Sequence, residues 1–209
     1  YHRENDVRNE VYNFSNSDID IFLTRQYLSK RKACMDSYED IVSTLINTRV
    51  NLYPHQIDAV IRATRNNTTR IMLADEVGLG KTIEALTVLK YYKQKNPKFR
   101  CLIVTPSSLE YQWSNEINDR FDIDAETFSY NKVIYKKTKT SVFIISYGEY
   151  YRYRYELDEM KWDMLIIDEA HKILRSNYYP ALMKASRLTR NVLLLSATPI
   201  VHDGIEYLQ

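Results

Sequence analysis

The chain has 209 residues, of which 44% are apolar, and a formal net charge of +2. This composition supports a folded domain with an apolar core plus an appendage, and it excludes a chain that is disordered throughout. A net charge this close to neutral also excludes a strong overall field, so any binding to nucleic acid must depend on a local patch.

The two cysteines, Cys34 and Cys101, have no metal-ligand spacing, and we interpret both as reduced thiols. No apolar run approaches the ~20 residues that span a membrane, and no signal peptide is recognisable. We therefore expect a cytoplasmic protein without a membrane partner, in the cytosol or nucleoid of a bacterium or in the nucleus of a eukaryote. Because the sequence begins at Tyr1 and not at methionine, we expect it to be part of a longer chain.

Residues 1–50 differ in character from the rest of the chain. They are polar and rich in Asn and Asp at first, and two helices are then expected, over residues 19–30 and 37–46. We interpret this part as a short, mainly helical accessory segment. A further helix, HQIDAVIRATR, leads into a main domain that we expect to span residues 51–209.

From Arg70 onward, short apolar runs alternate with stretches of helical periodicity. The expected strands are RIMLAD, RCLIVTP, AETFSY, TSVFIISY, WDMLIID and NVLLLSATP, and both RIMLAD and WDMLIID have the apolar character of buried strands. The expected helices are KTIEALTVLKYYKQ, SSLEYQWSNEINDRF and YPALMKASRLT. Ser107 or Ser108 would cap the second of these, and Pro180 lies in the first turn of the third.

This alternation of strands and helices predicts an α/β fold with a parallel sheet and right-handed crossovers. Ligands of such sheets bind outside the carboxyl ends of the strands. The candidate motifs all follow expected strands, after IMLA, LIV, LII and LLL. Their shared position predicts one common site.

The stretch LADEVGLGKTIEA has the pattern of a phosphate-binding loop between a strand and a helix. Gly78 and Gly80 would permit positive φ and a close approach of the backbone to a phosphate. Lys81 would neutralise the β- and γ-phosphates of ATP, and Thr82 would offer its hydroxyl to Mg²⁺. Asp75 stands where the strict pattern has glycine, so a simple strand-to-helix turn with a surface lysine is the alternative.

The stretch LIIDEAH places Asp168 and Glu169 at the end of a buried strand. Asp168 would hold Mg²⁺ through water, and Glu169 would polarise the water that attacks the γ-phosphate. An acidic helix start is the alternative, because carboxylates favour first turns. Together with the Lys-Thr loop at the same edge of the sheet, the pair favours an ATP and Mg²⁺ site.

Six motifs occur in a family-specific order along the chain: LYPHQIDAV, LADEVGLGKTIEA, LIVTPSSLEYQW, FIISYGEY, LIIDEAH and LLLSATPI. Their order resembles that of superfamily 2 helicases and translocases, and the first two are most similar to the Swi/Snf-like branch. That branch usually has Asp-Glu-x-Gly-Leu-Gly-Lys-Thr in the loop, which accounts for Asp75 and assigns Leu79 to the nucleotide-binding loop. The resemblance covers about residues 51–209 and implies a RecA-like P-loop NTPase lobe, a parallel sheet sandwiched by helices.

The resemblance also implies a contact to the base and a coupling element. Gln56 would hydrogen-bond the adenine edge, the alternative being an exposed helix glutamine. Ser196, Ala197 and Thr198 would couple hydrolysis to movement of the two lobes. His171 would bridge toward them, although a lone histidine is usually structural.

Two further motifs, TPSS and SYGEY, resemble elements that touch the phosphates of one nucleic-acid strand. The residues implied are Thr105, Pro106, Ser107, Ser146 and Tyr147. Ordinary caps and turns are the alternative for both motifs.

Three local features have simpler interpretations. The basic stretch NKVIYKKTKT is more typical of a solvated loop than of a phosphate contact, and the tyrosines of EYYRYRYELDEM are expected to pack rather than to stack on bases. Trp113 and Trp162 are expected in the core.

The family builds its ATPase site between two RecA-like lobes, and these motifs belong to the first. The resemblance implies a DNA-dependent ATPase that moves on duplex DNA, with a second lobe in cis, absent from this sequence, supplying an arginine. Because such an arginine is worth ~10³–10⁵ in rate, the fragment alone is expected to be a weak or inactive ATPase. An RNA helicase, or a non-motor scaffold lobe that binds a protein partner, remains an alternative. What the motor moves stays open.

Overall fold

A computed structural model describes residues 39–45, 48–50, 52–66, 68–74, 80–128 and 140–197. Two compact units are distinguished, Tyr1–Glu39 and Asp40–Gln209, and the description below concerns the second. The helix expected over residues 19–30 and nearly all of the basic stretch 131–140 lie outside the described residues, whereas residues 39–45 are helical as expected. The domain boundary at residue 50 stays a prediction.

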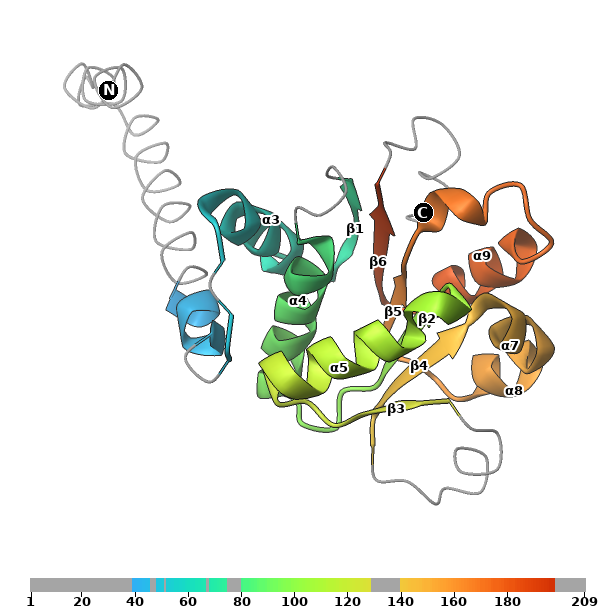
Figure 1. The fold of residues 1–209 in the computed structure, drawn as a ribbon, viewed down its shortest axis with the longest axis horizontal. Coiled ribbons are helices and arrows are strands. Elements are labelled where there is room, and N and C mark those ends of the chain that lie inside the picture. Colours follow the sequence, from blue (N-terminus) through green and yellow to red (C-terminus); the bar gives the residue numbers. More distant parts are fainter. Residues whose placement is uncertain are drawn as a thin grey trace, which may run out of the picture. The chain divides into compact units, whose positions relative to one another are not determined.

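The second unit is built on a six-stranded sheet whose paired strands are all parallel (Figure 1). The strand order is β1-β6-β5-β2-β4-β3. The strands are β1 Arg70–Ala74, β2 Cys101–Thr105, β3 Ala125–Thr127, β4 Val142–Ser146, β5 Met164–Ile167 and β6 Asn191–Ser196. Each expected strand is therefore present, and the predicted parallel α/β sheet is confirmed.

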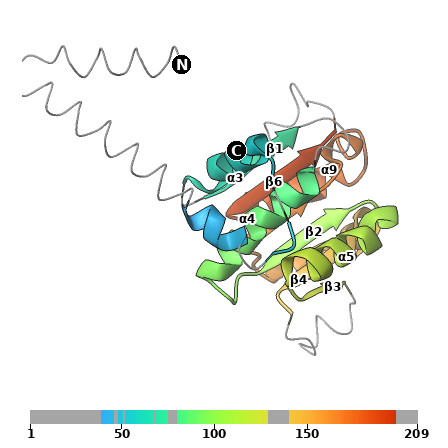
Figure 2. The ribbon, with the colours of Figure 1, turned by 60° about the vertical axis from the view of Figure 1, so that its left-hand side comes forward.

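Helices cover both faces of the sheet. They are α3 Pro54–Thr64, α4 Lys81–Lys95, α5 Glu110–Phe121, α7 Tyr147–Arg152, α8 Arg154–Glu159 and α9 Tyr179–Leu188, with 3-10 turns η1 Ser107–Leu109 and η2 Ala170–Lys172. Successive strand side chains point to opposite faces. In β2, Ile103 belongs to a core cluster with α3, α4 and α5, and Leu102 belongs to a second cluster with α7, α8 and α9. Figure 2 shows α3, α4 and α5 together on one side of the strands.

The central strands are fully buried because helices cover both of their faces. The expectation that RIMLAD is a buried strand is wrong for most of β1, where only Leu73 is buried. β1 ends the strand order and pairs with β6 alone among the described strands. An edge position leaves its side chains less covered than those of a central strand.

The start of α5 differs from the prediction. Ser107 and Ser108 do not cap this helix, because they lie in η1 and α5 begins at Glu110 without a side-chain cap. The amide of Leu109 donates instead to the carbonyl of Pro106 at 2.9 Å, so a tight backbone turn replaces the expected cap. The predicted proline in the first turn of α9 is confirmed.

The tryptophans predicted to lie in the core are buried, but not all of the tyrosines predicted to pack are buried. Trp113 and Trp162 are buried, as expected, and so is Tyr150. Tyr151 and Tyr155 are exposed, and the guanidinium of Arg154 lies over both rings, 4.4 and 4.3 Å from their centroids. Within the described part of the chain, no helix combines the length and the apolar character needed to cross a membrane.

Candidate functional site

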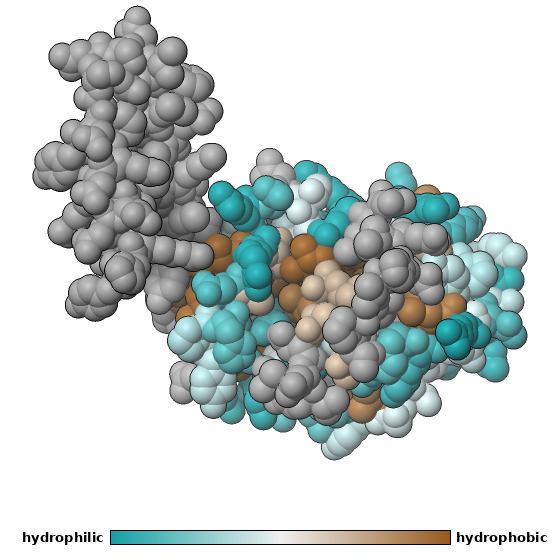
Figure 3. All heavy atoms as spheres, turned by 90° about the horizontal axis from the view of Figure 1, so that it is seen from above, coloured by the Kyte–Doolittle hydropathy of each residue, from teal (hydrophilic) through white to brown (hydrophobic). Residues whose placement is uncertain are grey.

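A pocket of about 450 Å³ opens at the carboxyl edge of the sheet, between the start of α4 and one face of α5. It is lined by Gly80, Lys81, Thr82, Ile83, Leu109, Gln112, Trp113, Glu116, Arg120, Asp168, Glu169 and Ala197. The structure thus brings the lysine loop and the acidic pair of LIIDEAH into one pocket. Figure 3 looks onto this edge of the molecule, where apolar surface near the middle is bordered by hydrophilic residues.

The glycine that precedes Lys81 is required by the backbone. Gly80 is the N-cap of α4 and has a φ of 89°, in the left-handed region. A Cβ at this position would overlap Nε2 of Gln56. Lys81 and Thr82 then begin a helix of 15 residues, whose amino end favours an anion. Asp75, Gly78 and Leu79 lie outside the described residues.

Asp168 follows β5 and accepts hydrogen bonds at both carboxylate oxygens. Oδ2 accepts from the indole Nε1 of Trp113 at 2.8 Å and from the hydroxyl of Thr105 at 3.3 Å. Oδ1 accepts from the amide of Glu169 at 2.8 Å. Burial raises the pKa of Asp168 above its ordinary value, and the bonds from Trp113, Glu169 and Thr105 partly oppose this effect. The carboxylate is therefore held in one orientation.

Glu169 is presented to the pocket by an unusual backbone conformation. Its φ of 49° and ψ of 42° are left-handed, which is uncommon for a residue other than glycine. Its Oε2 lies 3.3 Å from Nε2 of His171 and 3.8 Å from Nζ of Lys172. Nδ1 of His171 lies 3.1 Å from the hydroxyl of Ser196. His171 thus joins the acidic pair to the end of β6.

A model of the SNF2-related domain family matches residues 53–209. The chain belongs to this family. The Sulfolobus solfataricus SWI2/SNF2 ATPase core was solved with dsDNA and also as the core domain alone. Each is 24% identical to this chain and superposes with a TM-score of 0.68, over 79% of this chain. The chain spans 37% and 36% of those two chains.

These likenesses identify the SNF2-related domain as a RecA-like first lobe of the Swi/Snf-like branch of superfamily 2. Family membership supports use of a nucleotide and an ATP-hydrolysing enzyme in general. The expected α/β fold with a sheet between helix layers is the fold of that core.

In this SNF2-related domain, Gln56 is buried, so the alternative of an exposed helix glutamine is wrong. Its Oε1 accepts a hydrogen bond from the amide of Tyr53 at 2.9 Å, and its Nε2 faces the Cα of Gly80. The ring of Tyr53 is 68% exposed and stacks on His55. The side chain of Gln56 therefore connects the start of α3 to the lysine loop.

The residues expected to touch nucleic-acid phosphates divide into two groups. Ser107 is exposed and Pro106 is half-buried, so both are accessible at the carboxyl edge. The expectation for the side chain of Thr105 is wrong, because it is fully buried and its hydroxyl donates to Asp168.

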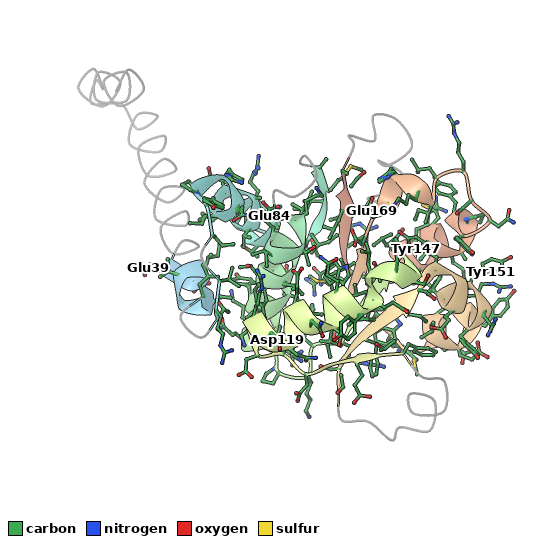
Figure 4. All side chains as sticks on the ribbon, viewed as in Figure 1. Glu39, Glu84, Asp119, Tyr147, Tyr151 and Glu169 are labelled. Atoms are coloured by element: carbon green, nitrogen blue, oxygen red, sulfur yellow. The ribbon has the colours of Figure 1, made fainter. Side chains whose placement is uncertain are left out.

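The SYGEY motif also has internal contacts. The hydroxyl of Ser146 accepts from the amide of Glu149 at 3.3 Å and caps α7, as in the alternative of an ordinary cap. The hydroxyl of Tyr147 donates to the backbone carbonyl of Asp168. Figure 4 labels Glu169 and Tyr147, both near this edge.

The donor set of the pocket fits Mg²⁺. Thr82 and Asp168 offer a hydroxyl and a carboxylate, the hard oxygen ligands that this ion prefers. Among the described residues, no group of three or more His, Cys, Asp or Glu could hold a metal ion. Mg²⁺ needs no such cage, because it usually takes one or two carboxylates together with substrate phosphates and water.

Two contacts of Asp168 were missed by sequence reasoning, which assigned Trp113 to the core and Tyr147 to a phosphate. Trp113 does lie in the core, but its indole N–H reaches the acidic pair. The spacing of Leu109, Gln112, Trp113, Glu116 and Arg120 places them on one helical face, and this periodicity could have indicated a shared pocket wall. Nothing local in the sequence indicated the bond from Tyr147.

Proposed function

We propose that this chain is the ATP-binding lobe of a DNA-dependent ATPase that couples hydrolysis to movement on duplex DNA. The observation that carries the proposal is the single pocket lined by Lys81, Thr82, Asp168 and Glu169. Lysine and a helix start offer positive charge to phosphates, and two carboxylates line the same pocket. Membership of the SNF2-related family supports the same chemistry.

Each residue of the pocket has a distinct role in the proposal. Lys81 and the first amides of α4 bind the β- and γ-phosphates, and Gln56 binds the adenine edge. Thr82 and Asp168 hold Mg²⁺, which when bound neutralises charge on the phosphates. Glu169 orients and activates the attacking water, and His171 fixes the position of Glu169 through the 3.3 Å contact.

Duplex DNA is proposed as the track of the full-length protein. The Sulfolobus solfataricus core was solved in complex with dsDNA, which is a property of that protein. In this chain the accessible segment Pro106–Ser107 lies at the same edge as the pocket and would contact one strand. A second RecA-like lobe of the full-length protein would close over the pocket and supply the arginine that completes the ATPase site.

The test compares ATP hydrolysis by the full-length protein with duplex DNA, with RNA and without nucleic acid. Duplex DNA should stimulate hydrolysis more than RNA does, and Lys81→Ala should lower the stimulated rate by about 10²-fold or more. Lys98→Ala, which removes an exposed lysine outside the pocket, is the matched control and should leave the rate unchanged. Stronger stimulation by RNA would support an RNA helicase. Full activity of Lys81→Ala would overturn the motor function and favour a scaffold lobe.

A further inference from the structure

Asp168 is held from both faces of the sheet. Trp113 of α5 donates to its Oδ2 at 2.8 Å, and Tyr147 of α7 donates to its backbone carbonyl. The two donors come from helices that pack on opposite faces, α5 with the first core cluster and α7 with the second. Asp168, whose carboxylate the proposed function assigns to Mg²⁺, is therefore held at its side chain by α5 and at its backbone by α7.

Both helices begin at the carboxyl edge of the sheet, next to residues that the family resemblance implies touch nucleic acid. The segment Pro106–Ser107 enters η1, which runs without a break into α5, and Trp113 lies in the first turn of that helix. On the other face, Ser146 is the N-cap of α7 and Tyr147 is its first residue. A displacement of Pro106–Ser107 therefore reaches Trp113 through about one turn of helix, and a displacement of Ser146 reaches Tyr147 directly.

The packing leaves little freedom to absorb such a displacement. Trp113 is 2% exposed and packs in the same cluster as Ile117 and Phe121. Tyr147 packs against Tyr178, with ring centroids 6.0 Å apart. Close-packed side chains transmit a shift of their backbone to the groups they touch. The indole and the phenol hydroxyl would therefore move with the starts of α5 and α7.

We propose that Trp113 and Tyr147 are positioning residues that link contact with nucleic acid at the starts of α5 and α7 to the orientation of the Asp168 carboxylate. This inference rests on the proposed function and adds the physical connection between its two sites. Neither residue touches the nucleotide in this proposal, because both act through Asp168. The hydrogen bond from Trp113 to the metal-binding carboxylate would tune its affinity for Mg²⁺, because groups that hydrogen-bond to a metal ligand orient that ligand, and the bond from Tyr147 would hold the backbone that carries the carboxylate.

The experiment uses the full-length protein with Trp113→Phe and Tyr147→Phe, which remove one donor each and keep the ring. Matched controls are Trp162→Phe, whose indole donates to the carbonyl of Leu157, and Tyr150→Phe, whose hydroxyl donates to Asp158. The readouts are the Mg²⁺ dependence of binding of a non-hydrolysable ATP analogue, the affinity for duplex DNA, and the stimulation of hydrolysis by that DNA.

We expect Trp113→Phe to raise the Mg²⁺ concentration needed for half-maximal analogue binding by about tenfold or more. Both variants should lose most of the stimulation by duplex DNA while the DNA affinity stays within about twofold, and the two controls should match the parent. Unchanged Mg²⁺ dependence and unchanged stimulation in both variants would overturn the inference. A loss of DNA affinity in proportion to the lost stimulation would overturn it too.

A second measurement leaves Trp113 and Tyr147 unmutated. The sequence has two tryptophans, so Trp162→Phe leaves Trp113 as the only tryptophan in this chain, which can be excited selectively over tyrosine at wavelengths above about 295 nm. In an otherwise tryptophan-free full-length protein, binding of duplex DNA should shift the emission of Trp113. Emission that does not respond while DNA binds would overturn the inference. The proposed function is tested separately by Lys81→Ala. Full ATPase activity of that variant would contradict the proposed motor function, not the link through Asp168.

Discussion

Nδ1 of His171 lies 3.1 Å from the hydroxyl of Ser196, and Nε2 of the same ring lies 3.3 Å from the carboxylate of Glu169. One imidazole thus connects Glu169, two positions after the end of β5, to Ser196, the last residue of β6. Because β5 and β6 are neighbours in the sheet, the contact joins two adjacent strand ends. A displacement of Ser196 would therefore act on Glu169 through His171.

The first prediction concerns this connection. Ser196→Ala should lower DNA-stimulated ATP turnover by about tenfold, because His171 loses the partner that holds its ring toward Glu169, while ATP affinity stays within about twofold. Steady-state kinetics of the full-length protein separates kcat from KM. Ser43→Ala, which removes a hydroxyl bonded only locally to the carbonyl of Asp40, should leave both constants unchanged. Equal effects of the two changes would contradict the connection.

The second prediction separates binding from chemistry at Glu169. Glu169→Gln should still bind ATP, but hydrolysis should fall by about 10²–10⁴-fold because the amide cannot accept the proton of the attacking water. Glu116→Gln is the control, since Glu116 lines the same pocket on α5 and accepts a hydrogen bond from Gln112 of its own helix. Nucleotide binding by calorimetry and turnover by phosphate release are measured together. Retained turnover in Glu169→Gln would remove this residue from the mechanism.

The third prediction uses two glycines with different surroundings. Gly80→Ala should destabilise the fold by about 1–3 kcal/mol, because φ is 89° and the new Cβ meets Nε2 of Gln56. Gly148→Ala should be neutral or stabilising, since its Cβ would have only the hydroxyl of Tyr178 nearby, at 3.9 Å, and alanine favours helix. Urea unfolding of both variants measures the difference. Equal losses would show that the left-handed backbone at Gly80 is not required.

The fourth prediction concerns pH and the start of α5. Burial and the charge of Glu149 raise the pKa of Glu110, against a hydrogen bond from the backbone of Ser146, and Oε1 of Glu110 has no hydrogen-bond partner among the described residues. A raised pKa means that the charged form is disfavoured in the folded state. Stability contributed by the protonated form is then present below the ordinary pKa of glutamate and is lost as pH rises through the raised value.

Glu110→Gln should therefore raise Tm relative to the parent at pH 7, and this gain should shrink as the pH falls toward ~4. Asp119→Asn on the exposed part of the same helix is the control and should show no such trend (Figure 4). Thermal unfolding across this pH range provides the comparison. A gain that grows toward acid pH would contradict the sign of the shift.

Much of the fold was predictable because β2, β4, β5 and β6 are apolar runs buried on both faces. The edge position of β1 was not, since burial depends on which strands pair, and pairing is not local in sequence. The cap predicted at Ser107 failed for a different reason, because a backbone turn from Pro106 competes with a hydroxyl cap.

The composition of the pocket could also be predicted, since parallel strands bring the ends of β1, β5 and β6 to one edge. The orientation of its groups could not. Thr105 belongs to a motif that was expected to touch phosphates, yet its hydroxyl, at the end of a central strand, donates to Asp168. Trp113 was predicted as a core residue, and only the packing of α5 brings its indole N–H to the same carboxylate.

The most direct test is the position of the metal in a crystal structure of the protein with a non-hydrolysable ATP analogue and Mn²⁺ in place of Mg²⁺. Anomalous scattering should place Mn²⁺ within about 4–5 Å of both the Thr82 hydroxyl and the Asp168 carboxylate, the reach of one bridging water. The β- and γ-phosphates should lie at Lys81. A nucleotide bound elsewhere, or a metal ion distant from both Thr82 and Asp168, would contradict the proposed site.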